Sequence, residues 1–247
     1  MTKKIGGNSL HPMTIAQIEA LKVFSELGFE VTQGPELENE WYCFDALNVP
    51  KDHPARDMQD TFFVKSKEKS DDSKKSFVLR THTTSATARA VEKAGKEGRL
   101  PCAFISVGKV FRNESTDATH EAMFYQVDGM LVVPKENAEE GSVSRLKGTL
   151  LHFYRKMLGE DVEIQLRPSF FPFVEPGLEV WVKFQDRWLE VMGAGIIHPN
   201  VLKNLGLDPE KYTGFAFGGG LDRIVMVKHN ISDIRYLYQG DLRINQF

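Results

Sequence analysis

The sequence predicts an α+β fold in which a mainly antiparallel sheet is flanked by a few helices. Helical periodicity is confined to a few segments, and these do not alternate one by one with the strands as they would in a parallel α/β protein. The predicted strands instead follow one another across short turns, which is typical of antiparallel pairing. There is no internal repeat and no linker rich in proline and glycine, so residues 1–247 are predicted to form a single domain.

The first predicted helix covers residues 14–27, where apolar side chains recur every three or four positions. Thr14 and Gln17 fit a capping box at its start, and Gly28 is a natural stop. The same periodicity predicts three more helices, at residues 85–94, 142–158 and about 220–229.

Strands are predicted where β-branched and aromatic residues gather between turn formers. These segments are residues 29–31, 61–64, 77–80, 103–107, 109–113, 123–133, 163–167, 178–184 and 187–192, with a strand of small residues at about 214–220. The polar stretch 65–76 is interpreted as a solvated hairpin tip, although its lysines could also meet a phosphate.

Charge and cysteine content narrow the possible classes of protein. Lys and Arg number 31 against 34 Asp and Glu, a net charge of −3, whereas a domain that wraps nucleic acid by itself is usually basic. Any contact with nucleic acid is therefore expected to be local or shared with another chain. Cys43 and Cys102 lie far apart and form no disulfide framework. No apolar run approaches the roughly 20 residues of a membrane span, so we expect a cytoplasmic protein with no membrane partner.

The common catalytic signatures are absent. The sequence contains no P-loop, no GxGxxG, no HExxH and no GxSxG, and its seven histidines lack metal-ligand spacing. These absences argue against the usual nucleotide-binding, metalloprotease and hydrolase classes.

Polar residues within apolar strands are the informative feature. Arg112 and Glu114 are two positions apart, so on a strand they would share a face. They could form a surface ion pair, or Arg112 could clamp an anion while Glu114 accepts a hydrogen bond from an amino group. Phe124, Gln126 and Asp128 also share a face, and such a row suits a ligand groove.

The glycine run 218–220 leads from a strand of small residues into a helix that carries Arg223. Glycines let a ligand approach the backbone closely, and an arginine in the first turn can reach back to a phosphate. A tight strand–helix turn with a surface arginine is the alternative that this segment alone leaves open.

Taken together, these segments resemble the three motifs of class II aminoacyl-tRNA synthetases. The first helix with residues 34–36 resembles motif 1, residues 111–114 resemble motif 2 and residues 218–223 resemble motif 3. Longer stretches resemble the α subunit family of phenylalanyl-tRNA synthetases, in the family's order across residues 10–247. These stretches are 53–62, 80–83, 117–120, 171–177, 193–195 with 198–199, and 214–218.

The resemblance implies the class II synthetase fold and a ligase that activates L-phenylalanine with ATP. The phenylalanyl-adenylate would then pass its acyl group to the 3′-terminal adenosine of tRNA(Phe). It also implies Mg²⁺ as a cofactor and a β subunit as partner in an α₂β₂ assembly. The family's N-terminal tRNA-binding arm is expected to be absent, because the resemblance to the catalytic core starts near Leu10.

The resemblance also implies roles at the nucleotide. Arg112 would hold the α-phosphate, and Glu114 would contact ATP or the amino group. His120 would meet the outer phosphates, Arg223 would brace the γ-phosphate, and Phe124 would stack on adenine.

At the amino acid, Phe171 and Phe173 would face the substrate ring and Ala216 would form the floor at its para position. Glu175 would contact Mg²⁺. The amino acid itself would be positioned by four polar residues: His82, Thr84, Gln126 and Asp128.

Three positions depart from the family's usual residues. Thr84 stands where bacterial relatives usually have serine, Asp128 is one methylene shorter than the usual Glu, and Gln59 replaces a frequent aromatic. A synthetase-like paralogue that binds or activates an amino acid without charging tRNA is the alternative function. The retained nucleotide residues favour the enzyme.

Overall fold

The computed structural model describes residues 4–5, 8–57, 60–64, 76–184 and 187–246. Its centre is a seven-stranded sheet in the order β3-β7-β8-β12-β11-β10-β9, and every neighbouring pair is antiparallel except β3 and β7. The prediction of an α+β fold around a mainly antiparallel sheet is confirmed. The strands are β3 (Glu30–Val31), β7 (Cys102–Phe111), β8 (Met123–Pro134), β9 (Glu163–Phe171), β10 (Val174–Phe184), β11 (Arg187–Ile197) and β12 (Tyr212–Gly220).

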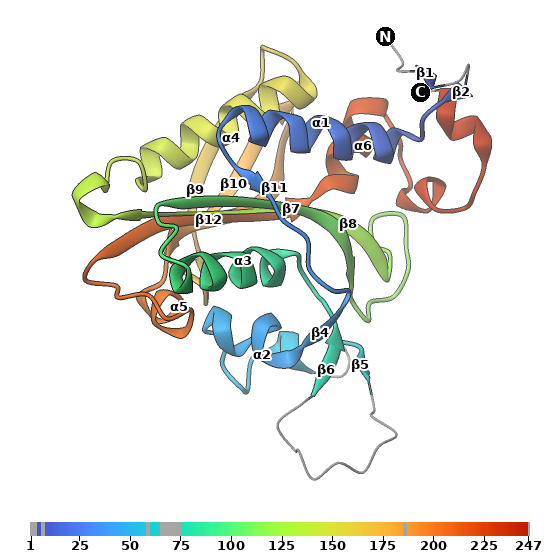
Figure 1. Cartoon of the computed structure of the whole chain (residues 1–247). Helices are drawn as coiled ribbons and strands as arrows, with labels where there is room; N and C mark the ends of the chain where they lie inside the picture. The colour runs from blue at the N-terminus through green and yellow to red at the C-terminus, as the bar shows by residue number, and fades with distance from the viewer. Residues whose placement is uncertain (1–3, 6–7, 58–59, 65–75, 185–186, 247) are drawn as a thin grey trace.

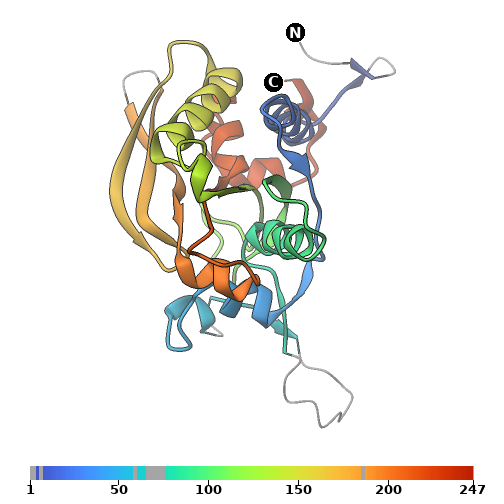
Figure 2. The ribbon, with the colours of Figure 1, turned by 60° about the vertical axis from the view of Figure 1, so that its left-hand side comes forward.

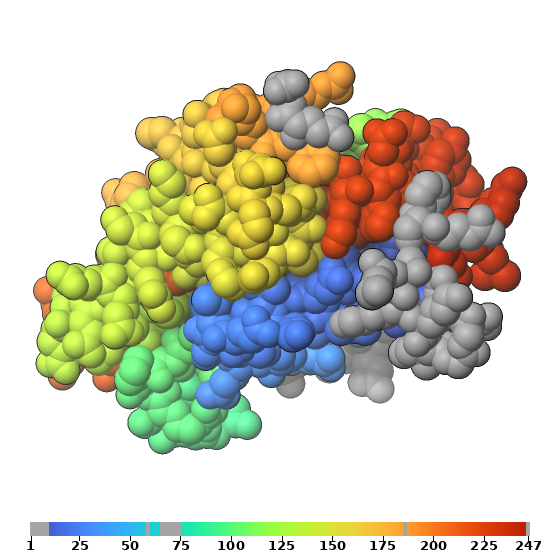
Figure 3. All heavy atoms as spheres, turned by 90° about the horizontal axis from the view of Figure 1, so that it is seen from above, coloured from blue at the N-terminus to red at the C-terminus, as the bar shows by residue number. Residues whose placement is uncertain are grey.

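Helices cover both faces of this sheet (Figures 1 and 2). On one face lie α1 (Pro12–Glu26), α4 (Val143–Leu158) and α6 (Leu221–His229), which contact one another and close over the sheet when it is seen from above (Figure 3). On the other face lie α3 (Thr84–Lys96), α5 (Pro199–Asn204) and the short α2 (Glu40–Cys43). A three-stranded sheet of β4 (Leu37–Asn39), β6 (Phe77–Leu79) and β5 (Phe63–Val64) adjoins α2, and β1 (Lys4–Ile5) pairs with β2 (Asn8–Ser9).

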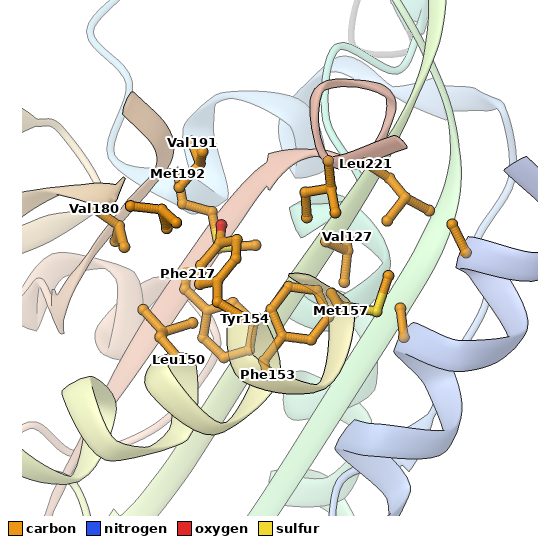
Figure 4. Packing of buried hydrophobic residues seen from close by; sticks show 14 of the residues in the cluster. Val127, Leu150, Phe153, Tyr154, Met157, Val180, Val191, Met192, Phe217 and Leu221 are labelled. Carbon is orange, nitrogen blue, oxygen red and sulfur yellow. The ribbon is translucent and has the colours of Figure 1, made fainter. Parts of the chain in front are cut away.

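The core is divided between the two faces of the sheet. Under α1 and α4, Phe24 stacks on Phe153 at 4.8 Å and on Phe217 at 5.1 Å between ring centroids. Figure 4 shows Phe153 and Tyr154 of α4 facing Phe217 and Met192 of the sheet. Aromatic burial of this kind is the largest favourable term in such a fold.

The alanine-rich face of α3 packs on the opposite side of the sheet. Its partners there include apolar residues of β7, β8, β12 and α5. The two faces of β12 therefore meet different cores, since Phe215 and Phe217 point to one and Ala216 to the other.

The first helix begins two residues earlier than predicted, and the capping-box prediction is wrong. Pro12 occupies the first turn, where its missing N–H costs nothing. The cap is His11, whose Nδ1 accepts a hydrogen bond from the Met13 N–H at 3.1 Å. The predicted helix at 142–158 is confirmed as α4, and its cap is Ser142, whose hydroxyl accepts from the Arg145 N–H at 3.2 Å.

The two strands predicted at 103–107 and 109–113 form a single strand, β7. Gly108 does not interrupt it. A Cβ at Gly108 would overlap the buried Arg80 guanidinium, so glycine here makes room for an arginine rather than a turn. That arginine donates to the Lys109 carbonyl at 2.7 Å and to the Gly34 carbonyl at 2.9 Å, which ties β6 to the sheet.

The predicted strands at 163–167, 178–184 and 187–192 are longer in the structure, where β9, β10 and β11 form two long hairpins. Three short helical turns separate the remaining elements: Asp45–Leu47, Pro54–Arg56 and Lys135–Asn137. Two more follow α6, at Ile234–Leu237 and Leu242–Gln246. The predicted hairpin tip, apart from Ser76, and Gln59 lie outside the described residues. Among the described residues, none of the helices combines the length and apolar character that a bilayer span requires.

Candidate active site

A cavity of about 820 Å³ opens where β8 and β11 begin and β12 ends, beside the start of α6. It is lined by the glycines of β12 and β11 and by a mixed set of charged residues. The charged residues are Arg112, Glu114, His120, Glu121, Arg187, Glu190, Asp222 and Arg223. Arginines facing carboxylates in one hollow are the composition expected for binding a polyanion together with its counter-ions.

The two motif arginines reach this cavity from distant parts of the chain. Arg112 follows β7, and Arg223 lies in the first turn of α6. They meet because β12 pairs with β8 in the sheet order, with Gly218 opposite Asp128 and Gly220 opposite Gln126. The sequence left open whether Arg112 forms a surface ion pair with Glu114 or binds an anion. Its place in a cavity shared with Arg223 favours the second hypothesis.

Arg112 and Glu114 do not share a strand face as predicted, because β7 ends at Phe111. Their side chains are still neighbours, 3.9 Å apart between guanidinium and carboxylate. The chain is held here because the Arg112 N–H donates to the Ala122 carbonyl at 3.0 Å. The Arg112 guanidinium also lies over the Phe124 ring, 5.2 Å from its centroid.

His120 is presented by a loop that Asp117 organises. The Asp117 carboxylate accepts hydrogen bonds from the N–H groups of Thr119 and His120, at 2.7 and 2.8 Å, and contacts His120 Nδ1 at 3.0 Å. These hydrogen bonds, with that of Thr119 the strongest, hold the pKa of Asp117 well below its usual range. The loop therefore has a fixed shape, and its histidine lines the cavity.

A buried carboxylate lies next to the cavity at Asp128. It is 3% exposed and accepts hydrogen bonds from the hydroxyls of Thr83 and Thr84, the latter at 2.7 Å. Burial raises the pKa of Asp128 to about 6, although both threonines and the charge of Arg112 oppose that rise. The group is thus ionised near neutral pH and lacks a direct salt-bridge partner among the described residues.

Two more acceptor atoms accompany Asp128. His82 Nε2 lies 3.0 Å from the Cys43 carbonyl and donates to it, which leaves Nδ1 as an acceptor. Burial, followed by the charge of Arg112, lowers the pKa of His82 to about 4, so the ring is neutral at physiological pH. His82 Nδ1 and Gln126 Oε1 are both buried and have no partner among the described residues. Gln126 lines the cavity, whereas His82, Thr84 and Asp128 lie behind its lining. Buried polar atoms are rarely left unpaired, so the unpaired Gln126 Oε1 at the cavity wall indicates a ligand.

Phe171 and Phe173 stack on one another with centroids 5.9 Å apart, and they pack against the apolar cluster that contains Ala216. None of the three lines the 820 Å³ cavity. The aromatic pair adjoins it at Gly193, a lining residue, since a Cβ there would lie 3.0 Å from the Phe171 ring. The aromatic pair predicted to face the substrate ring therefore packs behind the wall of the cavity and not in it.

Glu175 is also outside the cavity lining. Its carboxylate is 72% exposed and lies 3.4 Å from His198 Nε2. Across the described ranges, no three residues of the types His, Cys, Asp and Glu are grouped to hold a metal ion. A cation at Glu175 would need most of its ligands from water or from another chain.

Four charged residues of the cavity were not singled out from the sequence: Arg187, Glu190, Asp222 and Glu121. The first two belong to β11, whose pairing with β12 brings them to the site. Asp222 is 3% exposed and accepts from the Tyr125 N–H at 2.7 Å and from the Tyr238 hydroxyl. Burial raises the pKa of Asp222 to about 6. The sequence signal that could have identified Asp222 is its position directly before Arg223, at the start of the predicted helix.

The chain matches known proteins over nearly its whole length. The model of the tRNA synthetase class II core domain (F) family matches residues 1–247. The chain is 46% identical over 248 residues to the phenylalanine–tRNA ligase alpha subunit of Anoxybacillus flavithermus, covering 96% of this chain and 67% of that one. It is 45% identical to the alpha subunit from Staphylococcus carnosus, covering 100% and 69%.

Among solved structures, pyrrolysyl-tRNA synthetase from Desulfitobacterium hafniense superposes with a TM-score of 0.68 over 93% of this chain and 74% of that one. At 16% identity this likeness concerns the fold alone. The family model and the sequence matches establish that the chain belongs to the class II tRNA synthetase core family and, within it, to the alpha subunits of phenylalanine–tRNA ligases.

Proposed function

We propose that this chain is the catalytic subunit of a phenylalanine–tRNA ligase. It activates L-phenylalanine with ATP to phenylalanyl-adenylate and transfers the acyl group to the 3′-terminal adenosine of tRNA(Phe). One observation carries the proposal beyond family membership. Arg112 and Arg223 line the same cavity, and the wall of that cavity at Gly193 packs against the Phe171 ring.

Adenylate formation suits a site without a nucleophilic side chain. An oxygen of the substrate carboxylate attacks the α-phosphorus, the bond from that phosphorus to the bridging oxygen breaks, and pyrophosphate leaves. This displacement depends on alignment and on neutralising phosphate charge. We assign Arg112 to the α-phosphate, Arg223 and His120 to the outer phosphates, and Phe124 to the adenine ring. The arginine–aromatic contact at 5.2 Å supports pairing Arg112 with Phe124.

The substrate's ammonium group has three N–H donors, and the site offers three acceptors for it. These are His82 Nδ1, Gln126 Oε1 and the Asp128 carboxylate, the first two being buried without partners among the described residues. A neutral histidine is required for this role, because an imidazolium would repel the ammonium. Thr84 acts through Asp128 by donating its hydroxyl to that carboxylate.

Asp128 gives the reaction a pH dependence that can be measured. Because the pKa of Asp128 is about 6, its carboxylate is charged above that pH and neutral below it. We expect kcat/KM for phenylalanine, measured at saturating ATP, to fall by about tenfold per pH unit below pH 6. Asp128→Asn should lower kcat/KM and flatten this acidic limb. An acidic limb that is unchanged in Asp128→Asn would assign it to another group. ATP is kept saturating because Asp222, whose pKa is also about 6, lines the same cavity. Under that condition a change in ATP affinity as Asp222 titrates does not alter the pH profile for phenylalanine.

We assign Ala216 to the floor beneath the para position of the substrate ring, where it sets the selectivity between phenylalanine and para-substituted analogues. Ala216 is 5% exposed and packs in the same cluster as Phe171 and Phe173. Replacing it with glycine removes one methyl group there, so Ala216→Gly should raise kcat/KM for para-chlorophenylalanine relative to phenylalanine by roughly tenfold or more.

The matched control is Ala194→Gly in the neighbouring strand, since Ala194 is equally buried but faces the core under α1 and α4. Pyrophosphate exchange with both amino acids measures the ratio. A ratio that stays at the wild-type value in Ala216→Gly would place the para position elsewhere.

Mg²⁺ is expected to bind together with ATP. The carboxylates of Glu114 and Glu190 line the cavity together with the arginines, and oxygen donors of this kind suit Mg²⁺ bound mainly through phosphates. When bound, the ion neutralises phosphate charge. Glu175 remains a proposed Mg²⁺ contact, at a separate and exposed position that fits a site completed by another chain.

We further propose that the chain works in the cytoplasm with a β subunit, in an α₂β₂ assembly. The chain has a net charge of −3, so it offers little overall electrostatic attraction to the tRNA phosphates. This supports a role for other chains of the assembly in binding tRNA.

Phenylalanine-dependent ATP–pyrophosphate exchange tests the function, with the full chain alone and co-expressed with the β subunit from the same genome. We expect exchange from the co-expressed pair, and charging of tRNA(Phe) by it. Activity of the chain alone would contradict the need for a β subunit. Folded protein that exchanges under neither condition would instead be a synthetase-like paralogue.

A further inference from the structure

The segment that follows α6 borders the nucleotide cavity. Ile231 and Ile234 line the cavity, and residues 234–237 form a short helical turn. Figure 1 shows this part of the chain, in red, beside the ends of α6 and α1. Residues 231–238 are here called the C-terminal strap. None of them was assigned a role in the reaction above.

One end of the strap holds the loop that presents His120. The Ile234 N–H donates a hydrogen bond to the Ala118 carbonyl at 2.9 Å. Ala118 lies between Asp117, which organises the loop, and His120, which lines the cavity. The backbone of the strap is therefore tied directly to the histidine loop.

The other end of the strap holds the start of α6. The Tyr238 hydroxyl donates to one oxygen of the Asp222 carboxylate, while the other oxygen accepts from the Tyr125 N–H at 2.7 Å. Asp222 directly precedes Arg223 in α6, and Tyr125 lies between Phe124 and Gln126 in β8. A single buried carboxylate thus joins the strap, the arginine helix and the strand that carries the adenine-stacking residue.

We propose that the C-terminal strap is a positioning element for the nucleotide, in which Tyr238 acts through Asp222 on Arg223 and Phe124, and Ile234 acts through Ala118 on His120. This rests on the proposed function only in that ATP occupies the cavity. Three of the four groups assigned to the nucleotide, His120, Arg223 and Phe124, come from the loop, α6 and β8, and the strap and Asp222 connect these three elements.

Tyr238 can act on Arg223 because leaving the buried Asp222 charge without a hydrogen-bond partner costs free energy. Asp222 is 3% exposed, so without the Tyr238 hydroxyl one of its oxygens would lose its hydrogen bond inside the protein. The carboxylate would then turn toward water, and the first turn of α6 would shift with it. Arg223 projects from that turn, and small displacements of a positioning group have large kinetic effects.

Tyr238→Phe in the full 247-residue chain, with its β subunit, is the direct test. We expect the Kd and KM for ATP to rise about tenfold, with KM for phenylalanine within twofold of wild type. Tyr236→Phe is the matched control, since Tyr236 lies in the same turn but is 50% exposed, and it should change neither constant.

Ile234→Pro is the second variant. It removes the N–H that reaches Ala118 at the first residue of a helical turn, where proline is tolerated. It too should raise the Kd for ATP selectively. Thermal melts of each variant identify any loss of folding.

An unchanged Kd for ATP in Tyr238→Phe overturns the proposal. So does an equal rise in both KM values that follows a fall in Tm, because the strap would then be merely structural. If the wild type binds ATP but shows no phenylalanine-dependent exchange, the proposed function fails and the Kd comparison still decides the role of the strap. If the wild type binds no ATP, both proposals fail.

Discussion

Arg112→Ala is expected to reduce phenylalanine-dependent pyrophosphate exchange by about 10³-fold, the usual effect of removing a group that stabilises charge in the transition state. Arg112 lines the cavity, lies over Phe124 and pairs with Glu114 at 3.9 Å. After burial, its charge is the next cause of the lowered pKa of His82, and it opposes the rise that burial causes in the pKa of Asp128. The loss should therefore appear mainly in kcat, since the α-phosphate gains charge density during attack.

Two further substitutions make this expectation specific. Arg112→Lys keeps the charge but not the planar fork, so it should recover only part of the lost activity. Arg145→Ala removes an exposed arginine of α4 and should behave as wild type. Steady-state exchange with varied ATP and varied phenylalanine separates kcat from the two KM values. If Arg112→Ala keeps more than a tenth of the wild-type kcat, Arg112 does not contact the reacting phosphate.

Gly218→Ala is expected to raise KM for phenylalanine by about 10²-fold or more. A Cβ at Gly218 would overlap Asp128 Oδ1 and would lie 2.7 Å from Asp128 Cγ. The carboxylate would have to leave its hydrogen bonds with Thr83 and Thr84, and a buried charge displaced in this way loses its hydrogen-bond partners. The acceptor for the substrate's ammonium group would then be misplaced by an ångström or more, which costs on the order of 10²-fold.

The control for this variant is Gly148→Ala in α4. A Cβ at Gly148 meets nothing within 4 Å, and alanine there should stabilise the helix slightly without affecting KM. Direct ATP binding by Gly218→Ala distinguishes a local effect from misfolding, because ATP should still bind to a folded variant. A wild-type KM for phenylalanine in folded Gly218→Ala would show that Asp128 does not receive the amino acid.

Helix and strand identity followed largely from local pattern. The periodicity around Phe24 and Phe153 and the alternation along β8 are confirmed, because each depends on neighbours within one or two turns. The capping error at the first helix was also local, whereas another error occurred where a distant residue overrode local preference. Gly108 looked like a break between two strands, whereas it gives space to Arg80 from another sheet. Arg112 and Glu114 looked like one strand face, whereas the strand ends one residue before them.

The sequence by itself determined the residue types that adenylate chemistry needs, their order along the chain and the class of fold that holds them. Only the tertiary structure decided which of them meet. The pairing of β12 with β8 brings Arg223 to Arg112, and that of β11 with β12 adds Glu190. The tertiary structure also places Gly193 between Phe171 and the main cavity, and it leaves Glu175 at the surface. The physical reason is that a side chain's chemistry is local, whereas its partners, burial and pKa depend on strand order, which no single stretch of sequence encodes.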